Sequence, residues 1–210
     1  MKGGVFLIKT EFCLVPEVIT EEYIKDEAEG ISASIMKNNE EYILSLMNKK
    51  HRPSAFKSLA AMGILGAFAD QMGIFPTIAK TENGKPYFSD IPYIDFSISH
   101  SENLVACSVC ISKEQKPMIG IDCETIYKKD PMPIAERFFT KNEIETIAAS
   151  DDKAKAFTKL WTKKEAYLKL LGKGLSVPLS SFDAESLPYH FETCELMGNI
   201  FTICSEKTLF

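Results

Sequence analysis

Hydrophobic residues recur along this chain with two periods, one typical of helices and the other typical of strands. The clearest helical pattern follows Ser54, where apolar residues recur at spacings of three and four up to Gly73, a suitable helix C-cap. A second helical pattern runs from Asp151 to Leu171 and stops at the glycines of segment 172–174. Its apolar stripe consists of Phe157, Leu160, Trp161, Leu168 and Leu171. Two long amphipathic helices are therefore predicted, one in each half of the chain.

Alternating apolar and polar residues predict strands in several shorter segments. These segments are 5–13, 94–99, 104–111, 118–124, 189–196 and 199–205. Weaker helical patterns cover 21–37 and 40–47, and Thr140 and Glu143 have the spacing of a capping box before a helix at 144–149. Polar turns that contain glycine are expected at 82–86 and 198–199. This mixture of elements predicts an α/β (α+β) protein.

The length of 210 residues, with 45% hydrophobic and 25% charged residues, allows one large domain or two small ones. Segment 112–117 is polar and ends in proline, so it is the predicted linker between an N-terminal half, 1–112, and a C-terminal half, 113–210. No apolar run approaches the ~18 residues that span a bilayer, and the first apolar run is too short for a signal peptide. A cytoplasmic protein without membrane contact is expected.

The cysteines agree with a reducing compartment, because they are scattered and mostly lie inside apolar runs, as reduced core residues do. They are Cys13, Cys107, Cys110, Cys123, Cys194 and Cys204. Cys107 and Cys110 have Cys-x-x-Cys spacing, but without a second such pair a core position is favoured over a zinc site.

The net charge of -5 and the pI of about 5.4 argue against nucleic acid as a partner. An anionic ligand would need local basic clusters, although such clusters are most often solvated faces. One cluster consists of Lys49, Lys50, His51, Arg52 and Lys57, and the other of Lys159, Lys163, Lys164, Lys169 and Lys173. Lys57 and Ser58 also lie in the first turns of the predicted helix, where free backbone amides favour anions. His100, between two serines at a strand end, could bind an anion or simply be exposed.

Asp122 and Glu124 are candidates for a metal site. In a strand they point to the same side, roughly 7 Å apart, and carboxylates at that distance repel unless a cation or water separates them. Oxygen ligands of this kind suit magnesium, and the alternative is a pair of solvated acids at a strand end. In the second long helix, Glu165 lies about 40° and Lys169 about 80° from Trp161 around the axis, so both border the buried stripe.

Several motifs in order resemble the 4'-phosphopantetheinyl transferases, specifically the Sfp-like class that activates carrier proteins. The motifs are Gly-Lys-Pro at 84–86, Ser-Ile-Ser-His-Ser at 97–101, Gly-Ile-Asp-Cys-Glu at 120–124, Arg-Phe-Phe-Thr-Lys-Asn-Glu at 137–143, Trp-Thr-Lys-Lys-Glu-Ala-Tyr-Leu-Lys at 161–169 and Gly-Lys-Gly-Leu at 172–175. The resemblance covers roughly residues 50 to 182 and rests on motif order as well as on each motif.

This resemblance implies a pseudo-twofold arrangement of two similar α/β halves, with coenzyme A bound in the cleft between them. It also implies a reaction in which a carrier-protein serine attacks the β-phosphate of coenzyme A, takes the phosphopantetheine arm and releases 3',5'-ADP. Magnesium is the implied metal, with manganese as an alternative. The implied partners are coenzyme A and an apo acyl or peptidyl carrier protein, and a monomer is expected because two halves already form the cleft.

The resemblance also assigns roles to individual residues. Metal ligands would be Asp122, Glu124 and Glu165; Glu165 would double as the general base, with Glu143 as its rival or water-positioning partner. Lys169 would hold the pyrophosphate and stabilise the leaving group. Coenzyme A would contact Lys57, Ser58, Gly84, Lys85, Pro86, Ser99 and His100, with His100 on the 3'-phosphate and Lys85 beside the adenine.

Two departures and two alternative functions belong to this interpretation. Lys57 stands where the class often has arginine, which removes a bidentate phosphate contact, and Cys123 replaces a more usual aliphatic residue. A protein that only binds coenzyme A, or a hydrolase that cleaves its pyrophosphate with water, would use a similar cleft. The carrier surface is expected to be an apolar patch around Phe138, Phe139 and the exposed face that follows Glu143. The sequence leaves open which biosynthetic pathway the carrier serves and whether acyl-coenzyme A is accepted.

Overall fold

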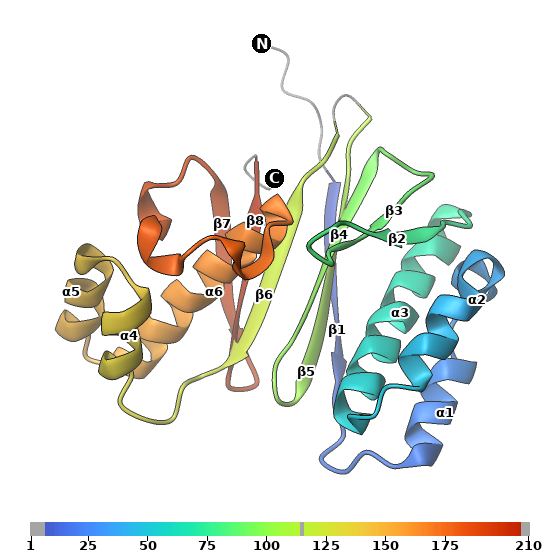
Figure 1. Ribbon diagram of the computed structural model, residues 1–210, viewed down its shortest axis with the longest axis horizontal. Coiled ribbons are helices and arrows are strands. Elements are labelled where there is room, and N and C mark those ends of the chain that lie inside the picture. Colours follow the sequence, from blue (N-terminus) through green and yellow to red (C-terminus); the bar gives the residue numbers. More distant parts are fainter. Residues whose placement is uncertain (1–6, 114–115, 207–210) are drawn as a thin grey trace.

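The computed structural model describes residues 7–113 and 116–206, which form two adjoining halves (Figure 1). Residues 5 and 6 of the first predicted strand, and residues 114–115 of the predicted linker, lie outside the described residues. In the part of the chain that is described, no helix is long and apolar enough to cross a membrane.

The first half is a three-stranded antiparallel sheet in the order β1-β5-β4, with three helices packed on one side and a small hairpin attached. Its strands are β1 (Leu7–Leu14), β2 (Ile78–Lys80), β3 (Pro86–Phe88), β4 (Ile94–His100) and β5 (Leu104–Ile111). Its helices are α1 (Glu21–Glu29), α2 (Ala33–Met47) and α3 (Arg52–Met72). Figure 1 shows the helices on the outer side of this sheet, away from the second half.

The second half is also built on a three-stranded antiparallel sheet, in the order β6-β8-β7. Its strands are β6 (Ile119–Thr125), β7 (His190–Leu196) and β8 (Asn199–Ser205), and its helices are α4 (Met132–Phe138), α5 (Lys141–Ala149) and α6 (Lys153–Leu171). Short 3-10 turns at Gly174–Ser176, Leu179–Ser181 and Ala184–Ser186 connect α6 to β7.

The two halves have the same topology. Each begins with a strand, continues through helices that end in a long one (α3 or α6), and closes with a hairpin whose last strand pairs antiparallel with the first. Figure 1 shows the sheets next to each other in the centre, with α1–α3 on one side and α4–α6 on the other. The predicted fold, two similar α/β halves, is therefore confirmed.

Strand β5 explains how the halves pack. Val105, Cys107 and Val109 face the helices of the first half, whereas the alternate residues Leu104, Ala106 and Cys110 pack against β6 and β8. Because both faces are buried, the strand reads as a continuous apolar run. The spacing of three also puts Cys107 and Cys110 on opposite faces, so their predicted positions as core residues are confirmed.

The helical pattern at 21–47 is divided differently from the prediction. The first helix ends at Gly30, and α2 then continues through Asn39, where φ is -134° and the helix is kinked. The buried Asn39 amide donates to the carbonyls of Ile35 and Pro76 and accepts from the Ile78 amide, so this polar side chain is fully used inside the helix. Strands β2 and β3 were not predicted, because three residues are too few to show alternation.

The predicted helix ends are confirmed. Gly73 and Gly172 have left-handed backbone conformations, with φ of 64° and 63°, and they end α3 and α6. Thr140 and Glu143 form the predicted capping box at the start of α5. The closing hairpin turns at Met197 and Gly198.

Candidate functional site

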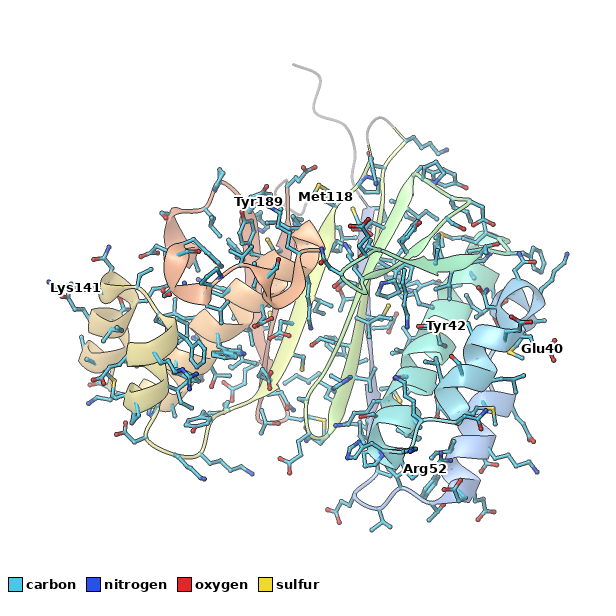
Figure 2. All side chains as sticks on the ribbon, viewed as in Figure 1. Glu40, Tyr42, Arg52, Met118, Lys141 and Tyr189 are labelled. Atoms are coloured by element: carbon cyan, nitrogen blue, oxygen red, sulfur yellow. The ribbon has the colours of Figure 1, made fainter. Side chains whose placement is uncertain are left out.

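A cavity of about 670 Å³ lies between the two halves, where β4 runs beside β6. The first half contributes Tyr42, Leu46, Lys49, Lys57, Ser58, Ala61, Met62, Lys80, Gly84, Pro86, Ile98, Ser99 and His100. The second half contributes Asp122, Glu124, Trp161, Glu165 and Lys169. Figure 2 labels Tyr42, which lies on α2 and lines this wall. Of the residues predicted for the site, all except Lys85 and Glu143 line this cavity.

The acidic end of the cavity depends on a close contact between α6 and β6 at Gly120. A Cβ atom on Gly120 would lie 1.9 Å from the Ala166 carbonyl oxygen and 2.5 Å from the Leu170 nitrogen. Only glycine therefore allows the helix to lie this close to the strand. The contact brings Glu165, the residue before Ala166, to the same side of β6 as Asp122, as the strand periodicity predicts.

Asp122 is 3% exposed, and its two carboxylate oxygens differ in their surroundings. Oδ1 accepts hydrogen bonds from the Ser99 hydroxyl at 2.9 Å and from the Lys169 ammonium at 2.7 Å. Oδ2 is buried and has no hydrogen-bond partner in the described residues. A buried carboxylate oxygen without a donor is costly, and a bound cation would satisfy it.

The other two carboxylates of this end are partly buried and disfavoured as anions. Burial, followed by the charges of Asp122 and Glu165, raises the pKa of Glu124 to about 7, although Lys169 and Lys57 oppose the shift. Burial and the charge of Asp122 also raise the pKa of Glu165, with Lys169 again opposing. Mutual repulsion among carboxylates is the environment that a divalent cation relieves.

The donors at this end suit a hard cation. In the described residues, no three His, Cys, Asp or Glu side chains converge closely enough to enclose a metal ion by themselves. Magnesium does not need such an enclosure, because it keeps several waters and is usually shared between one or two carboxylates and substrate phosphates. The unpartnered Oδ2 of Asp122, with Glu124 and Glu165 on the same cavity, fits that mode of binding.

The basic end of the cavity belongs to the first half. It is formed by Lys49, Lys57, Lys80 and His100. Lys57 donates to the carbonyl oxygen of Ser101 at 2.6 Å, and Lys49 donates to the hydroxyl of Ser58 at 2.7 Å. Partial removal from water, then the charges of Lys57 and Lys169, lowers the pKa of His100, so this end favours an anion.

Side chains of β4 join the two halves, from Asp95 to Ser99, which lines the cavity. Asp95 accepts from the amide of Ile119 at 2.9 Å, Ser97 from Ile121 at 3.0 Å and Ser99 from Cys123 at 3.1 Å. The acceptors are every second residue of β4, and the amides are those of every second residue of β6. The β4 side chains therefore accept the hydrogen bonds that backbone carbonyls of a paired strand would otherwise accept. The arrangement fixes β6, and therefore Asp122, relative to the first half.

Lys85 belongs to this junction and is turned away from the cavity. Its ammonium pairs with Asp95 at 2.8 Å and donates to the carbonyl oxygen of Ile119 at 3.0 Å. Its side chain is 14% exposed and borders a smaller cavity, of about 230 Å³, between loop 83–86 and the glycines after α6. Its predicted place beside an adenine stays a prediction.

Glu143 lies apart from the acidic end. Its carboxylate pairs with the fully buried Lys164 at 2.8 Å and accepts from the amides of Thr140 at 2.9 Å and Ala184 at 2.9 Å. Lys164 also donates to the carbonyl oxygens of Leu179 and Phe182. This pair ties α5 and α6 to segment 179–184, so the contacts of Glu143 are structural and its predicted catalytic role has no support from this geometry.

Trp161, which lines the cavity, packs against aromatic side chains of the second half. Phe138 lies edge-on to Trp161 with ring centroids 5.9 Å apart, whereas Phe139 is 4% exposed and packed in the core. The ring of Phe139 fills the space against Phe157, so Phe139 supports the predicted carrier surface from the core, and the position of that surface stays a prediction. A second cavity, of about 200 Å³, shares Glu124 and Trp161 with the main one. Its other lining residues are Thr125, Tyr127, Ile134, Phe157 and Thr158.

Sequence reasoning missed part of the first-half wall. The missed residues are Tyr42, Leu46, Ala61, Met62, Lys80 and Ile98. Ala61 and Met62 lie four residues after Lys57 and Ser58, so helical spacing could have identified them. Nothing local marks Tyr42 or Lys80, which reach the cavity because α2 packs against α3 and Asn39 of α2 binds the Ile78 amide of β2.

Comparisons with known proteins show a match between part of this chain and a family. Residues 118–208 match the model of the 4'-phosphopantetheinyl transferase superfamily. This stretch contains Asp122, Glu124, Glu165 and Lys169.

Related proteins match a larger part of the chain. A 4'-phosphopantetheinyl transferase of Bacillus subtilis is 38% identical over 138 residues, which are 63% of this chain and 59% of that protein. The 4'-phosphopantetheinyl transferase gsp of Aneurinibacillus migulanus is 33% identical over 158 residues, 72% of this chain and 62% of its own length. The 4'-phosphopantetheinyl transferase Sfp of Bacillus subtilis (strain 168) is 43% identical over 103 residues, 48% of this chain and 43% of its own. The matches thus span 43–62% of the length of these relatives.

Proposed function

We propose that this chain, whose residues 118–208 match the 4'-phosphopantetheinyl transferase superfamily, transfers the phosphopantetheine arm of coenzyme A to a serine of an apo acyl or peptidyl carrier protein. The serine oxygen forms a bond to the β-phosphorus of coenzyme A, the bond from that phosphorus to the 3',5'-ADP oxygen breaks, and 3',5'-ADP leaves. The observation that carries the proposal is the polarity of the cavity, which has carboxylates at one end and basic groups at the other.

The basic end would bind the nucleotide part of coenzyme A. Lys57 and His100 would hold the 3'-phosphate, with Ser58 and Ser99 beside them, and Gly84 and Pro86 would border the adenine. A phosphate would offset the repulsion between these cationic groups. Because the pKa of His100 is lowered, phosphate binding would draw a proton onto its imidazole.

At the acidic end, Asp122, Glu124 and Glu165 would hold Mg²⁺, with Mn²⁺ as an alternative. When bound, such an ion offsets the negative charge that develops on the transferring diphosphate. Lys169 would contact the diphosphate and stabilise the leaving 3',5'-ADP oxygen. Its side chain is 30% exposed and lines the cavity, so it can reach a ligand there.

Glu165 is the proposed general base, acting on the serine hydroxyl directly or through a water. Its raised pKa supports this role, because a carboxylate that is disfavoured as an anion accepts a proton more readily. Glu143 ranks second, since its carboxylate is already engaged by Lys164.

The carrier protein would approach from the second half, next to Phe138. The apolar cavity beside Glu124 and Trp161 is suited to the uncharged arm of coenzyme A. We expect the protein to act as a monomer, because one chain already provides both walls of the cavity. All six cysteines are unpaired, which supports work in the reducing cytoplasm.

The test is to incubate the protein with coenzyme A, Mg²⁺ and a panel of apo carrier proteins, and to weigh the carriers by intact mass spectrometry. One carrier is expected to gain about 340 Da, the mass of the arm moved by this phosphoryl transfer. A chelator and the Glu165→Gln variant should both remove the gain. Glu145→Gln is the matched control, because Glu145 is exposed on α5 and away from the cavity.

Other outcomes identify the alternatives. Coenzyme A bound but intact, with no carrier modified, would indicate a protein that only binds this ligand. Free phosphopantetheine without modified carrier would indicate a hydrolase that uses water as the nucleophile. Either result would overturn the transferase proposal.

A further inference from the structure

Lys169 occupies one oxygen of the carboxylate whose other oxygen fits a metal ion. Its ammonium lies 2.7 Å from Oδ1 of Asp122 and 2.7 Å from the hydroxyl of Ser99. Asp122 is 3% exposed, and its other oxygen has no partner in the described residues. One oxygen of the carboxylate, Oδ1, is therefore paired with a cation, whereas Oδ2 accepts no hydrogen bond from the described residues.

Lys169 is also the cation that compensates the whole acidic end. Its charge opposes the shifts that burial and neighbouring carboxylates impose on Glu124 and Glu165. Lys169 forms an ion pair with Asp122 at this end of the cavity. Among the described residues, Glu124 and Glu165 form no ion pair there. Lys57 acts on Glu124 as well, but its ammonium is bound to the carbonyl of Ser101.

The Lys169 ammonium cannot bind Asp122 and a diphosphate ligand at the same time. An ammonium at hydrogen-bond distance from Oδ1 repels a divalent cation placed against the same carboxylate. The same ammonium is needed on the diphosphate during transfer, and a lysine on a flexible stem with 30% of its side chain exposed can move between the two. A diphosphate would thus remove the competitor when it arrives.

We propose that Lys169 is a resident counter-ion that competes with the divalent metal for Asp122 until a diphosphate ligand draws its ammonium away. The identity of that ligand rests on the proposed function, whereas the competition rests on the contacts of Lys169 alone. Metal and coenzyme A would consequently bind with positive cooperativity, and linkage requires each to raise the affinity of the other by the same factor. In the free protein the metal would bind weakly.

The test measures metal binding without coenzyme A, with Mn²⁺ as the probe and the loss of its free-ion paramagnetic resonance signal as the readout. Lys169→Met, which removes the charge and keeps the apolar stem, should bind Mn²⁺ more tightly than wild type by about 5- to 150-fold, the usual range of coupling between ligands. Lys169→Gln is a second neutral variant in case Lys169→Met is poorly folded. Lys169→Arg keeps the charge and should bind Mn²⁺ as weakly as wild type.

Lys163→Met is the matched control. Lys163 lies on the same helix and pairs with Glu185 at 2.5 Å, but it does not line the cavity. Its Mn²⁺ affinity should equal that of wild type. If both neutral variants at Lys169 bind Mn²⁺ no more tightly than wild type, the inference is overturned.

Coenzyme A separates the two proposals. Adding it should raise the Mn²⁺ affinity of wild type more than that of Lys169→Met, because only wild type has a competitor to remove. If the variants show unchanged Mn²⁺ affinity and the wild type modifies the carrier normally, only the counter-ion proposal is overturned. Tighter Mn²⁺ binding in the variants, without carrier modification by wild type, would overturn only the transferase function.

Discussion

The acidic and basic ends of the cavity are built in different ways. The acidic side chains come from neighbouring elements of the second half, β6 and α6, brought together at Gly120. The basic side chains come from separate parts of the first half: the turn after α2, the start of α3, β2 and β4. Basic groups such as Lys57 have partners of their own, whereas Glu124 and Glu165 are left with mutual repulsion.

This difference suggests that the acidic end serves the chemical step and the basic end serves the affinity for coenzyme A. A rigid group of poorly satisfied carboxylates favours a cation and a proton transfer, so changes there should act on kcat. Basic groups distributed over several elements can hold a large anion at many points, so a change at one of them should act mainly on the KM for coenzyme A. The following predictions test that division.

The largest effect is expected from Glu165→Gln. The amide keeps the shape but cannot accept the serine proton or contribute negative charge, so kcat should fall by about 10²- to 10⁴-fold. Calorimetric binding of coenzyme A to the variant, measured without divalent ions, should change little. A variant that transfers within tenfold of wild type would assign the base to another residue.

Next is Gly120→Ala, which should separate α6 from β6. The new methyl group would meet the backbone of Ala166 and Leu170, which cannot move aside as a side chain could. We expect a loss of about 3 kcal/mol or more of unfolding free energy, which lowers Tm by roughly 6–12 °C in a protein of this size.

Gly63→Ala in α3 is the control for this substitution. The nearest atom to its new Cβ would be the end of the Glu27 side chain, at 3.4 Å. Because alanine favours helix, the control should be neutral or more stable by up to about 1 kcal/mol. Equal Tm values for the two variants would show that α6 can retreat from β6.

Lys57→Ala should weaken the basic end. Loss of one hydrogen bond to a charged group, worth about 1.5–3 kcal/mol, should raise the KM for coenzyme A by about 10- to 100-fold with kcat nearly unchanged. Lys50→Ala is the control, because Lys50 is exposed and does not line the cavity. With 3'-dephospho-coenzyme A the variant and wild type should differ little. A fall in kcat instead would contradict the division between the ends.

The smallest effect is expected from Glu124→Gln, measured without divalent ions. Because the pKa of folded Glu124 is raised to about 7 from 4.5, its contribution to stability is present below pH 4.5 and is lost as pH rises through about 7. The variant should therefore have the higher Tm at pH 8, by about 2–4 °C for each kcal/mol relieved, and no advantage near pH 4. Mn²⁺ should reverse the order at pH 8. If the wild-type Tm at pH 8 without metal equals or exceeds that of the variant, the proposed repulsion between Glu124 and its neighbouring carboxylates is contradicted.

The periodic elements could be predicted because their causes are local. The stripes of α3 and α6, the alternation in β6 and the capping box at Thr140 need only a few neighbouring residues to define them. Strands β2 and β3 escaped prediction because their hydrogen-bond partners, not their composition, make them strands. The helix through Asn39 escaped for a similar reason, since its amide is satisfied by the distant residues Pro76 and Ile78.

The sequence by itself determined the two similar sets of elements, the carboxylates on one side of β6, and the residues of α6 that approach them. It determined these because helical and strand periods set the direction of each side chain. Only the tertiary structure decided that Lys85 holds β6 and that Glu143 pairs with Lys164. It also decided that Lys169 lies on Asp122, because a long charged side chain selects among partners that are remote in the chain.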